Sequence, residues 1–286
     1  MAKIINLSVT GVIPCFNSEA TIEQTILSLK DQTILLHEII VIDDGSTDQT
    51  AIIAAKHGCR IISLEQTLGR GHARNLGICE SKTPFVLFCD SSNVIDIRFV
   101  ETALQHLHDK TVSACFGRIA NHTSLQDPLS IWRSRHLFRE NEPYRSDVHI
   151  VKTLITYAVL LRKEHVIQVG NFNAKLRECE DQDLGDKLLY HKYKLLSDPR
   201  LIAYSLRKES LSSLYLRYRR WHSDYKGSQN IILQFLDTLK TSFLIFARKD
   251  LLAKRFKSTL ISIYLPFYLL FYDFLHKIII PVKNDD

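Results

Sequence analysis

Several features that would classify a protein at once are missing from this chain of 286 residues. Its six cysteines include no C-x-x-C pair, which argues against a disulfide frame and against a zinc site, and four of them lie in or beside apolar segments. No long apolar leader precedes the first apolar segment, so we expect no secretory signal. Together these absences predict an intracellular protein whose thiols are reduced and mostly buried.

A charge excess of one sign is missing from most of the chain. Residues 1–203 carry 23 Lys and Arg against 24 Asp and Glu, whereas residues 204–286 carry 14 against 7, so the formal net charge of +6 arises in the last third. We expect no nucleic-acid partner. Because 45% of the residues are apolar, the chain can bury a large core, and we expect one large domain or one domain with an appendage.

Up to about residue 120, short apolar runs alternate with helix-like segments. The alternation predicts βαβ units, and hence an α/β fold with a mostly parallel, Rossmann-like sheet flanked by helices. The strands are expected at Ile5–Ile13, Glu38–Ile42, Arg60–Ser63, Phe85–Cys89 and Ser113–Ile119. The helices are expected at Ala20–Leu29, Asp48–Lys56, Gly71–Glu80 and Ile97–His106. The first two helices have capping residues before them, Ser18 or Glu19 and Ser46 or Thr47.

The composition changes along the rest of the chain. Residues 121–151 are polar and irregular, which indicates a long loop with one helix, and such loops are usually functional or mobile. Beyond Tyr204, helix formers dominate together with basic residues and aromatics. We therefore expect one domain over residues 1–205 and a helical, basic and aromatic carboxyl-terminal region over residues 206–286.

Two acids and a turn follow the second predicted strand directly, in Asp43-Asp44-Gly45-Ser46-Thr47-Asp48. The carboxyl end of a parallel strand is where open α/β sheets bind ligands. A carboxylate there can accept a hydrogen bond from a base or a ribose, which predicts a nucleotide-like ligand. The alternative is that Asp43 and Asp44 only cap the turn at Gly45.

Three further segments lie at equivalent places. Pro14, Phe16 and Asn17 end the first strand, and the exposed ring can stack on a base, although Phe16 can also be a core residue and Asn17 a cap. A glycine-rich helix start carries Arg74, and arginine with free helix amides suits a diphosphate, although a solvated loop is the more common outcome. Asp90 follows the strand Phe85–Cys89 and can face the same crevice as Asp44.

Four acids lie within six positions in Glu178-Cys179-Glu180-Asp181-Gln182-Asp183. The helix dipole favours negative charge in a first turn, which can explain Glu178 and Asp183 without any catalytic role. A carboxylate near a nucleotide leaving group is also what a displacement reaction needs to take a proton from an incoming hydroxyl.

In this order the motifs closely resemble those of family two inverting glycosyltransferases with the GT-A fold, over roughly residues 6 to 205. The matching segments are Ile13-Pro14-Cys15-Phe16-Asn17, Val41-Ile42-Asp43-Asp44-Gly45-Ser46-Thr47-Asp48, Ala73-Arg74-Asn75, Asp90-Ser91-Ser92 and Glu180-Asp181-Gln182-Asp183-Leu184. The ordered set is much more specific than any single member.

The resemblance implies a role for each matching position. It implies that Phe16, between Pro14 and Asn17, stacks on the base of a nucleotide-sugar donor, that Asp44 contacts the base, and that Arg74 helps to hold the nucleotide. The family's D-x-D motif falls on Asp90, Ser91 and Ser92. Its E-D pair falls on Glu180 and Asp181, with Asp181 in the position of the catalytic base.

One departure from the family concerns the metal. Ser92 replaces the last acid of D-x-D, the usual ligand of a divalent cation, and a hydroxyl is a poor substitute for a carboxylate toward Mg²⁺ or Mn²⁺. Three outcomes follow: a weakly held metal, a metal held by Asp90 and the diphosphate alone, or no metal. In the last case Arg74 and other cations stabilise the departing diphosphate.

The stretch Thr259–Tyr272 has 14 residues without charge and contains Pro266. A spanning helix needs about 20 apolar residues, so this stretch predicts an interfacial or re-entrant helix, with the preceding basic residues attracted to anionic lipid. A buried helix that closes the domain is the alternative.

The sequence thus predicts a cytoplasmic glycosyltransferase, peripheral on the inner face of a membrane, that moves a sugar from a nucleotide diphosphate to a hydroxyl with inversion. The expected acceptor is a glycan or a lipid-linked molecule. A catalytically impaired donor-binding or scaffold protein of the same fold is the alternative. A nucleotidyltransferase would leave Glu180 and Asp181 without a clear role.

Overall fold

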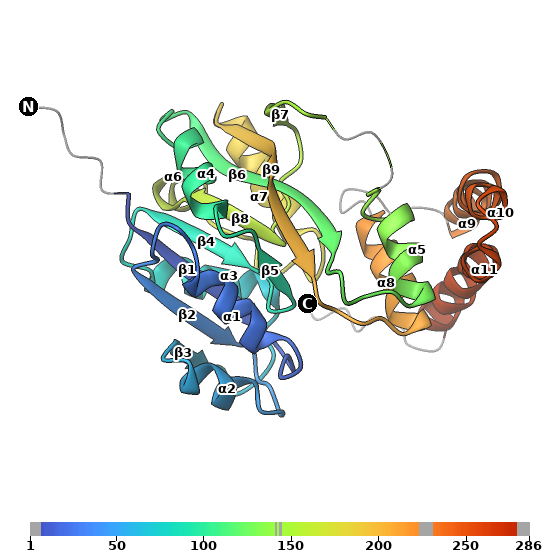
Figure 1. Ribbon diagram of the computed structural model, residues 1–286, viewed down its shortest axis with the longest axis horizontal. Helices are drawn as coiled ribbons and strands as arrows, with labels where there is room; N and C mark the ends of the chain where they lie inside the picture. The colour runs from blue at the N-terminus through green and yellow to red at the C-terminus, as the bar shows by residue number, and fades with distance from the viewer. Residues whose placement is uncertain (1–6, 141, 143–144, 223–230, 279–286) are drawn as a thin grey trace, which may run out of the picture. The chain divides into compact units, whose positions relative to one another are not determined.

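The computed structural model describes residues 7–140, 142, 145–222 and 231–278 (Figure 1). Within these residues nine strands form one sheet in the order β3-β2-β1-β4-β8-β6-β9-β5, and β7 pairs with β9. The strands are β1 (Val9–Cys15), β2 (Glu38–Asp43), β3 (Arg60–Ser63), β4 (Phe85–Cys89), β5 (Asn93–Ile95), β6 (Val112–Asn121), β7 (His149–Val151), β8 (Ala158–Arg162) and β9 (Lys194–Ser205). The sheet confirms the α/β fold class. Ile5, where the first strand was expected to begin, lies outside the described residues.

Parallel pairing dominates the half of the sheet that holds the first four strands. β3, β2, β1 and β4 are neighbours in parallel register, and β6 pairs in parallel with β9. The remaining four pairings are antiparallel. β8 separates β4 from β6 and runs antiparallel to both, so the sheet is mixed beyond β4.

The strand order reverses between the neighbouring strands β1 and β4. Open α/β sheets usually bind their ligands at the carboxyl ends of the strands at such a point. β1 pairs with β4 only as far as Val12, whereas its pairing with β2 continues to Cys15. The carbonyl of Cys15 accepts from the amide of Asp44 on the β2 side, so Pro14 presents its nitrogen toward the side that β4 has left. Proline is therefore tolerated here in a central strand.

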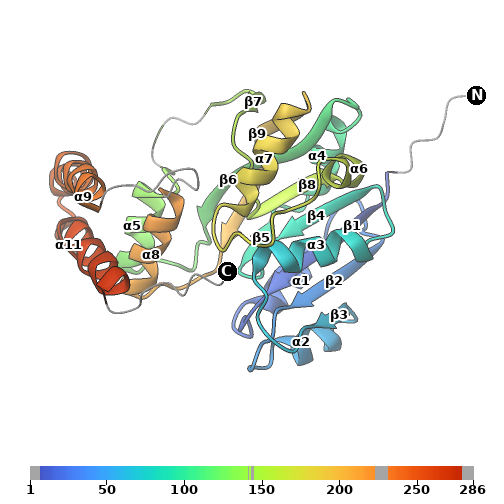
Figure 2. The same cartoon turned by 180° about the vertical axis from the view of Figure 1, so that it is seen from behind.

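Helices cover both faces of the sheet (Figures 1 and 2). They are α1 (Ile22–Lys30), α2 (Thr50–Lys56), α3 (Arg70–Glu80), α4 (Phe99–His106), α6 (Lys163–Gln168) and α7 (Glu180–Tyr190). α3, α6 and α7 bury one core with β1, β4 and β8, including Val12, Phe88 and Leu184. α3 lies so close to β1 that a Cβ at Gly77 would be 2.4 Å from Val12 Cγ1.

The expected helix caps are wrong. α1 and α2 begin after Thr21 and Gln49, and neither side chain caps its helix. Ser18 and Ser46 instead belong to the turns: the Ser18 hydroxyl is 2.7 Å from the Ser91 hydroxyl, and the Ser46 hydroxyl accepts from the Asn17 amide. These side chains join segments that are distant in the sequence, which local capping preferences do not predict.

By their internal contacts the residues divide into two compact units. The first comprises Met1–His122 and Pro143–Arg207, and the second comprises Thr123–Glu142 and Lys208–Asp286. The second unit contains α5 (Pro128–His136), α8 (Leu211–Trp221), α9 (Ile231–Lys240), the π-helix η1 (Thr241–Ala247), α10 (Arg248–Leu252) and α11 (Phe256–Ile278). α5, the helix expected in the polar loop, thus belongs with the carboxyl-terminal helices.

The second unit has its own core. Trp132 of α5 is fully buried and donates from Nε1 to the Ser262 hydroxyl over 2.8 Å. Tyr215 of α8 is buried and donates to the Ile261 carbonyl over 2.6 Å. Leu265 of α11 is buried as well. α11 is therefore part of this core on one face.

α11 is longer than the charge-free stretch indicates. It continues through Pro266, and its segment Phe256–Leu275 is long and apolar enough to cross a membrane, with 44% of it buried within the structure. The whole helix therefore has the length that the charge-free stretch alone lacks. Whether the helix spans a membrane or lies on it stays a prediction.

Candidate active site

The turns after β1 and β2 are tied to each other. Asn17 has a φ of 47°, its amide donates to the Ser46 hydroxyl over 2.8 Å, and its side-chain oxygen accepts from the Thr47 amide over 2.9 Å. Phe16 is 50% exposed, so it is not a core residue. The arrangement presents a flat ring at the carboxyl end of β1, where stacking on a base is possible.

The two adjacent acids serve different segments. Asp43 accepts from the Ser46 amide over 3.0 Å and so closes the turn, as the alternative interpretation expected. The buried carboxylate of Asp44 instead accepts from the amides of Leu68 and Gly69 over 2.8 and 2.9 Å. Asp44 thereby fixes the loop that leads into α3. Each carboxylate oxygen can accept a second hydrogen bond, so contact with a base stays possible.

Arg74 on α3 is the centre of a charge network, although it is only 1% exposed. Its Nη1 is 2.5 Å from Glu180 Oε1, and its Nη2 is 3.3 Å from Asp90 Oδ1. Its guanidinium also lies 5.7 Å from the ring centre of Phe172. Burial alone would lower the pKa of Arg74, but the surrounding acids raise it. The network brings α3, the end of β4 and the start of α7 to one place.

Glu180 and Asp181 are neighbours with opposite electrostatics. Burial raises the pKa of Glu180, but the charges of Arg74 and Arg70 outweigh this effect and the pKa is lowered. Burial also raises the pKa of Asp181, and the charge of Glu180 adds to the shift. The environment thus shifts the pKa values of these two carboxylates in opposite directions, as happens where neighbouring carboxylates have different roles in a site. The raised pKa makes Asp181 the candidate general base of the two.

The segment after β4 is held from several sides. The Asp90 side chain is 39% exposed, and its backbone amide donates to the Tyr157 carbonyl. The Ser91 hydroxyl is 2.7 Å from the Ser18 hydroxyl. Asn93 is buried and its side chain donates to the same Tyr157 carbonyl over 3.0 Å. Asp90 is thus the accessible carboxylate of the segment.

Few side chains at the candidate site could ligate a metal ion. In the described part of the chain, no three His, Cys, Asp or Glu side chains are grouped closely enough to hold an ion. Asp90 supplies one carboxylate, and Mg²⁺ commonly binds through one or two carboxylates together with substrate phosphates. The Asp90 carboxylate therefore fits a cation that arrives together with the diphosphate of a ligand.

Three supporting residues were given no role of their own by the sequence, although Asn75 lies in the matching segment Ala73-Arg74-Asn75. Asn75 donates to the Phe172 carbonyl over 2.8 Å and accepts from its amide over 2.9 Å, which fixes the ring beside Arg74. The Thr156 hydroxyl is 3.4 Å from Asp181 Oδ2. Arg70 Nε is 4.0 Å from Glu180 Oε1. The position of Arg70 at the start of α3 was the feature of the sequence that could have indicated its place in the site.

A family model described as "Glycosyl transferase family 2" matches residues 10–170. The chain belongs to this family. The match includes Phe16, Asp44, Arg74 and Asp90, whereas Asp181 lies beyond it. The assignment of Asp181 as the base therefore depends on the site geometry and on the motif resemblance.

Among curated relatives, the poly-beta-1,6-N-acetyl-D-glucosamine synthases of Staphylococcus aureus (strain COL) and Staphylococcus epidermidis are 25% and 24% identical to this family 2 chain over 240 residues. Each alignment covers 82% of this chain and 58% of the relative. The chain thus spans somewhat more than half the length of these relatives.

Solved structures have the same fold. S. aureus TarS 1–349 in complex with UDP-GlcNAc matches with a TM-score of 0.56 and 22% identity, over 71% of this chain and 59% of that one. The mannosyltransferase PcManGT from Pyrobaculum calidifontis, in complex with GDP-Man and Mn²⁺, matches with a TM-score of 0.56 and 16% identity, over 90% and 69%. The GT-A type fold is confirmed.

Proposed function

We propose that this chain is an inverting glycosyltransferase that moves a sugar from a nucleoside diphosphate donor to an acceptor hydroxyl. The observation that carries the proposal is the position of Asp181, whose pKa is raised, beside the network of Arg74, Glu180 and Asp90. The fold shared with TarS and PcManGT, which bind UDP-GlcNAc and GDP-Man, supports a nucleotide-sugar donor.

In the proposed reaction, Asp181 takes the proton of the acceptor hydroxyl while the acceptor oxygen forms a bond to the anomeric carbon. The bond from that carbon to the diphosphate breaks, and its electron pair leaves with the nucleoside diphosphate. Attack from the face opposite the leaving group inverts the anomeric carbon. Arg70 and Arg74 stabilise the departing diphosphate.

Donor binding uses the carboxyl ends of β1, β2 and β4. The ring of Phe16 stacks on the base, with Pro14 and Asn17 shaping its turn, and Asp44 accepts from the base. Glu180 orients Arg74 through their short ion pair. Thr156, by its hydroxyl, orients the Asp181 carboxylate.

A divalent cation, Mg²⁺ or Mn²⁺, would be held by Asp90 and the donor's diphosphate oxygens. The charges of the site favour such a cation, because two arginines stand against three carboxylates and a diphosphate therefore enters a site that is already negative. The arginines are Arg70 and Arg74, and the carboxylates are those of Asp90, Glu180 and Asp181. When bound, the cation would neutralise charge on the leaving group.

The acceptor is proposed to be a glycan or a lipid-linked molecule, handled on the cytoplasmic face of a membrane. Support comes from the similarity to synthases of poly-beta-1,6-N-acetyl-D-glucosamine and from the second unit. The exposed face of α11 carries Leu260, Tyr264, Phe267 and Phe271, each about half-exposed or more. An apolar stripe of this kind indicates contact with lipid.

The test is to incubate the protein with UDP-GlcNAc or GDP-mannose and an acceptor glycan, with Mn²⁺ or with a chelator, and to identify the nucleotide released. Release of UDP or GDP together with an inverted product is expected. Release of pyrophosphate would indicate a nucleotidyltransferase. Donor binding without turnover under every condition would instead favour the scaffold alternative.

A further inference from the structure

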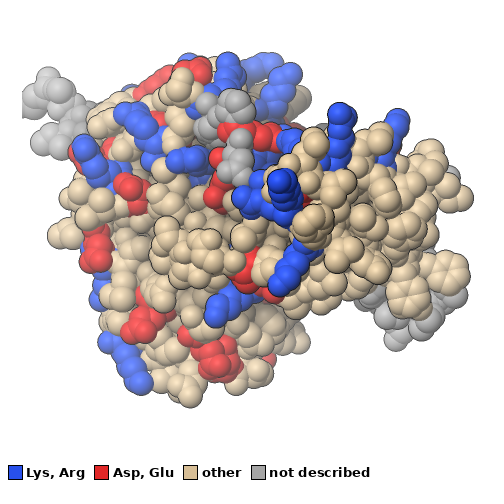
Figure 3. Space-filling model, turned by 45° about the vertical axis from the view of Figure 1, so that its right-hand side comes forward, with Lys and Arg blue, Asp and Glu red and all other residues tan. Residues whose placement is uncertain are grey.

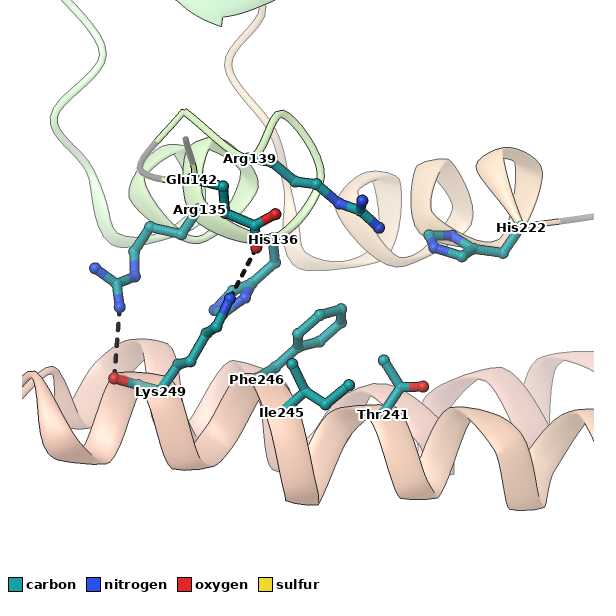
Figure 4. A pocket seen from close by; sticks show the side chains of 9 residues that line it. All are labelled: Arg135, His136, Arg139, Glu142, His222, Thr241, Ile245, Phe246 and Lys249. Atoms are coloured by element: carbon teal, nitrogen blue, oxygen red, sulfur yellow. Dashed lines mark hydrogen bonds and ion pairs between the residues drawn. The ribbon is translucent and has the colours of Figure 1, made fainter. Parts of the chain in front are cut away.

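A pocket of about 250 Å³ lies entirely within the second unit (Figure 4). It is lined by α5 and the residues that follow it, by the end of α8, and by η1 and α10. Ligand pockets for drug-sized molecules usually hold about 300–1,000 Å³. The pocket is therefore suited to a small group and is too small for a whole nucleotide sugar.

Cationic side chains dominate the lining. Arg135, Arg139 and Lys249 all line the pocket, against Glu142 as the one carboxylate among the lining residues. Lys249 Nζ is 2.8 Å from Glu142 Oε1. Arg135 is neutralised by the buried Asp250, whose Oδ1 is 2.8 Å from Arg135 Nε.

Arg139 differs from the other two cations. It is exposed, follows α5 with a φ of 54°, and makes no ion pair within the described residues. Figure 4 shows its guanidinium extending over Phe246 toward His222. Its five donors are thus available to a planar or tetrahedral anion.

The floor of the pocket is apolar and continues onto the molecular surface. Phe246 is buried below the cations, whereas Ile245 lines the pocket and is also 47% exposed. Neighbouring side chains on η1 and α10, Leu244 and Leu252, are exposed by 63% and 75%. Figure 3 shows a broad area without charged side chains on the helical part at the right.

We propose that this pocket binds the phosphate group of a membrane lipid, whose hydrocarbon chain lies along the exposed apolar side chains of η1 and α10. A cationic pocket with one guanidinium that has no ion pair among the described residues suits the phosphate, and the adjoining apolar surface suits the chain. A free phosphate ion would gain nothing from that surface. η1 itself supports a function here, because π-helical turns occur frequently at functional sites.

The test is vesicle co-sedimentation of the full chain with three variants, Arg139→Gln, Lys249→Gln and the control Arg248→Gln. Arg248 is exposed on the same helix as Lys249 but does not line the pocket, so its variant has the same charge change. One set of phosphatidylcholine vesicles contains phosphatidic acid, and the other contains oleate at equal surface charge. Inorganic phosphate is added as a competitor in a third arm.

The control variant should lose no more than about fivefold in affinity for either vesicle, which is the loss expected when any cation near an anionic surface is removed. Arg139→Gln should lose about tenfold or more on phosphatidic acid, because it removes charge-assisted hydrogen bonds, and no more than the control on oleate. Lys249→Gln should follow the same pattern. Circular dichroism checks that all variants are folded.

Equal losses for Arg139→Gln and Arg248→Gln on phosphatidic acid would overturn the proposal, since binding would then be unspecific surface attraction. The proposal would also be overturned if Arg139→Gln lost equal affinity for the phosphatidic acid and the oleate vesicles. Full displacement by millimolar inorganic phosphate would show a free-anion site in place of a lipid site. None of these readouts involves sugar transfer, so their failure would leave the proposed enzymatic activity standing.

Discussion

The two units differ in the apolar side chains that they leave outside, although both bury charge. At the candidate site of the first unit Arg74 and Glu180 are 1% and 3% exposed, and in the second unit the side chains of the ion pair between Arg133 and Glu209 are both 0% exposed. In the second unit large apolar side chains are left outside: of the 27 exposed ones in the described chain, 14 lie between Ile232 and Phe274. The first unit thus encloses a polar site, whereas the second has an outer surface suited to an apolar environment. Four predicted effects test this difference.

The largest effect is expected from Asp181→Asn. Loss of a general base lowers kcat by about 10²- to 10⁴-fold, while donor binding, measured by thermal shift with the nucleotide, stays nearly unchanged because the amide keeps the side chain's shape. The matched control is Asp183→Asn on the same helix, since Asp183 pairs with Lys187 over 2.7 Å. Turnover retained in the Asp181 variant would remove that residue from the role.

The second effect is on stability. Arg74→Met leaves Glu180 as a buried and uncompensated charge, which costs about 3–5 kcal/mol in the free energy of unfolding. Arg70→Met is the control: Arg70 is 52% exposed, so its distant ion pair contributes at most about 1 kcal/mol after screening. Urea unfolding measures both.

A double variant separates structure from function at this site. Arg74→Met combined with Glu180→Leu replaces the pair with apolar side chains, which often restores stability. Donor affinity should stay low, because the guanidinium is absent. If donor affinity returned along with stability, Arg74 would have a structural role only.

The third effect concerns the outer surface of the second unit. Replacing Leu260, Phe267 and Phe271 with Ser should release the protein from the membrane fraction, at about 1 kcal/mol of binding free energy for each half-exposed side chain. Leu35→Ser, at a residue 78% exposed in the first unit, should change nothing. Deletion of α11 is a poorer test, because it also removes Leu265 from the core. Unchanged partitioning of the triple variant would contradict membrane contact through α11.

The smallest effect is a pH dependence of stability. The pKa of Asp181 is raised in the folded state, so its contribution to stability is fully present below its usual pKa, about 3.9, and is lost as the pH rises through the folded-state pKa. Asp181→Asn should therefore melt at a higher temperature than the wild type at pH 7, and the difference should vanish in acid. Calorimetry across this range measures it. A lower melting temperature at pH 7 would mean that the carboxylate stabilises the fold.

Much of the first unit could be predicted from local sequence. The strands at Arg60–Ser63 and Phe85–Cys89 have the expected bounds, and the four predicted helices are present within two residues of their predicted starts. Apolar runs and periodicity decide such elements locally. The helix caps could not be predicted in this way, because Ser18 and Ser46 bind distant turns instead of their own helices.

The candidate site was predicted in its members but not in its connections. The sequence pointed to Arg74, Asp90 and Asp181 separately, as acids or arginines at strand ends and helix starts. That Arg74 bridges Asp90 and Glu180, and that Asn75 holds Phe172 beside it, depends on α3 and α7 packing on the same face of the sheet. These pairings join residues 16, 97 and 106 positions apart and carry no local signal.

By itself, the sequence determined the alternation of strands and helices, the order of the motifs and the uneven distribution of charge, because each of these is a property of neighbouring residues. Tertiary structure alone decided that Glu180 pairs with Arg74 and that the pKa of its neighbour Asp181 is raised. It also decided that α5 joins the carboxyl-terminal helices and that Arg139 lies above Phe246 without an ion pair in the described part of the chain. The physical reason is that burial and electrostatic shifts arise from the whole set of groups packed around a side chain.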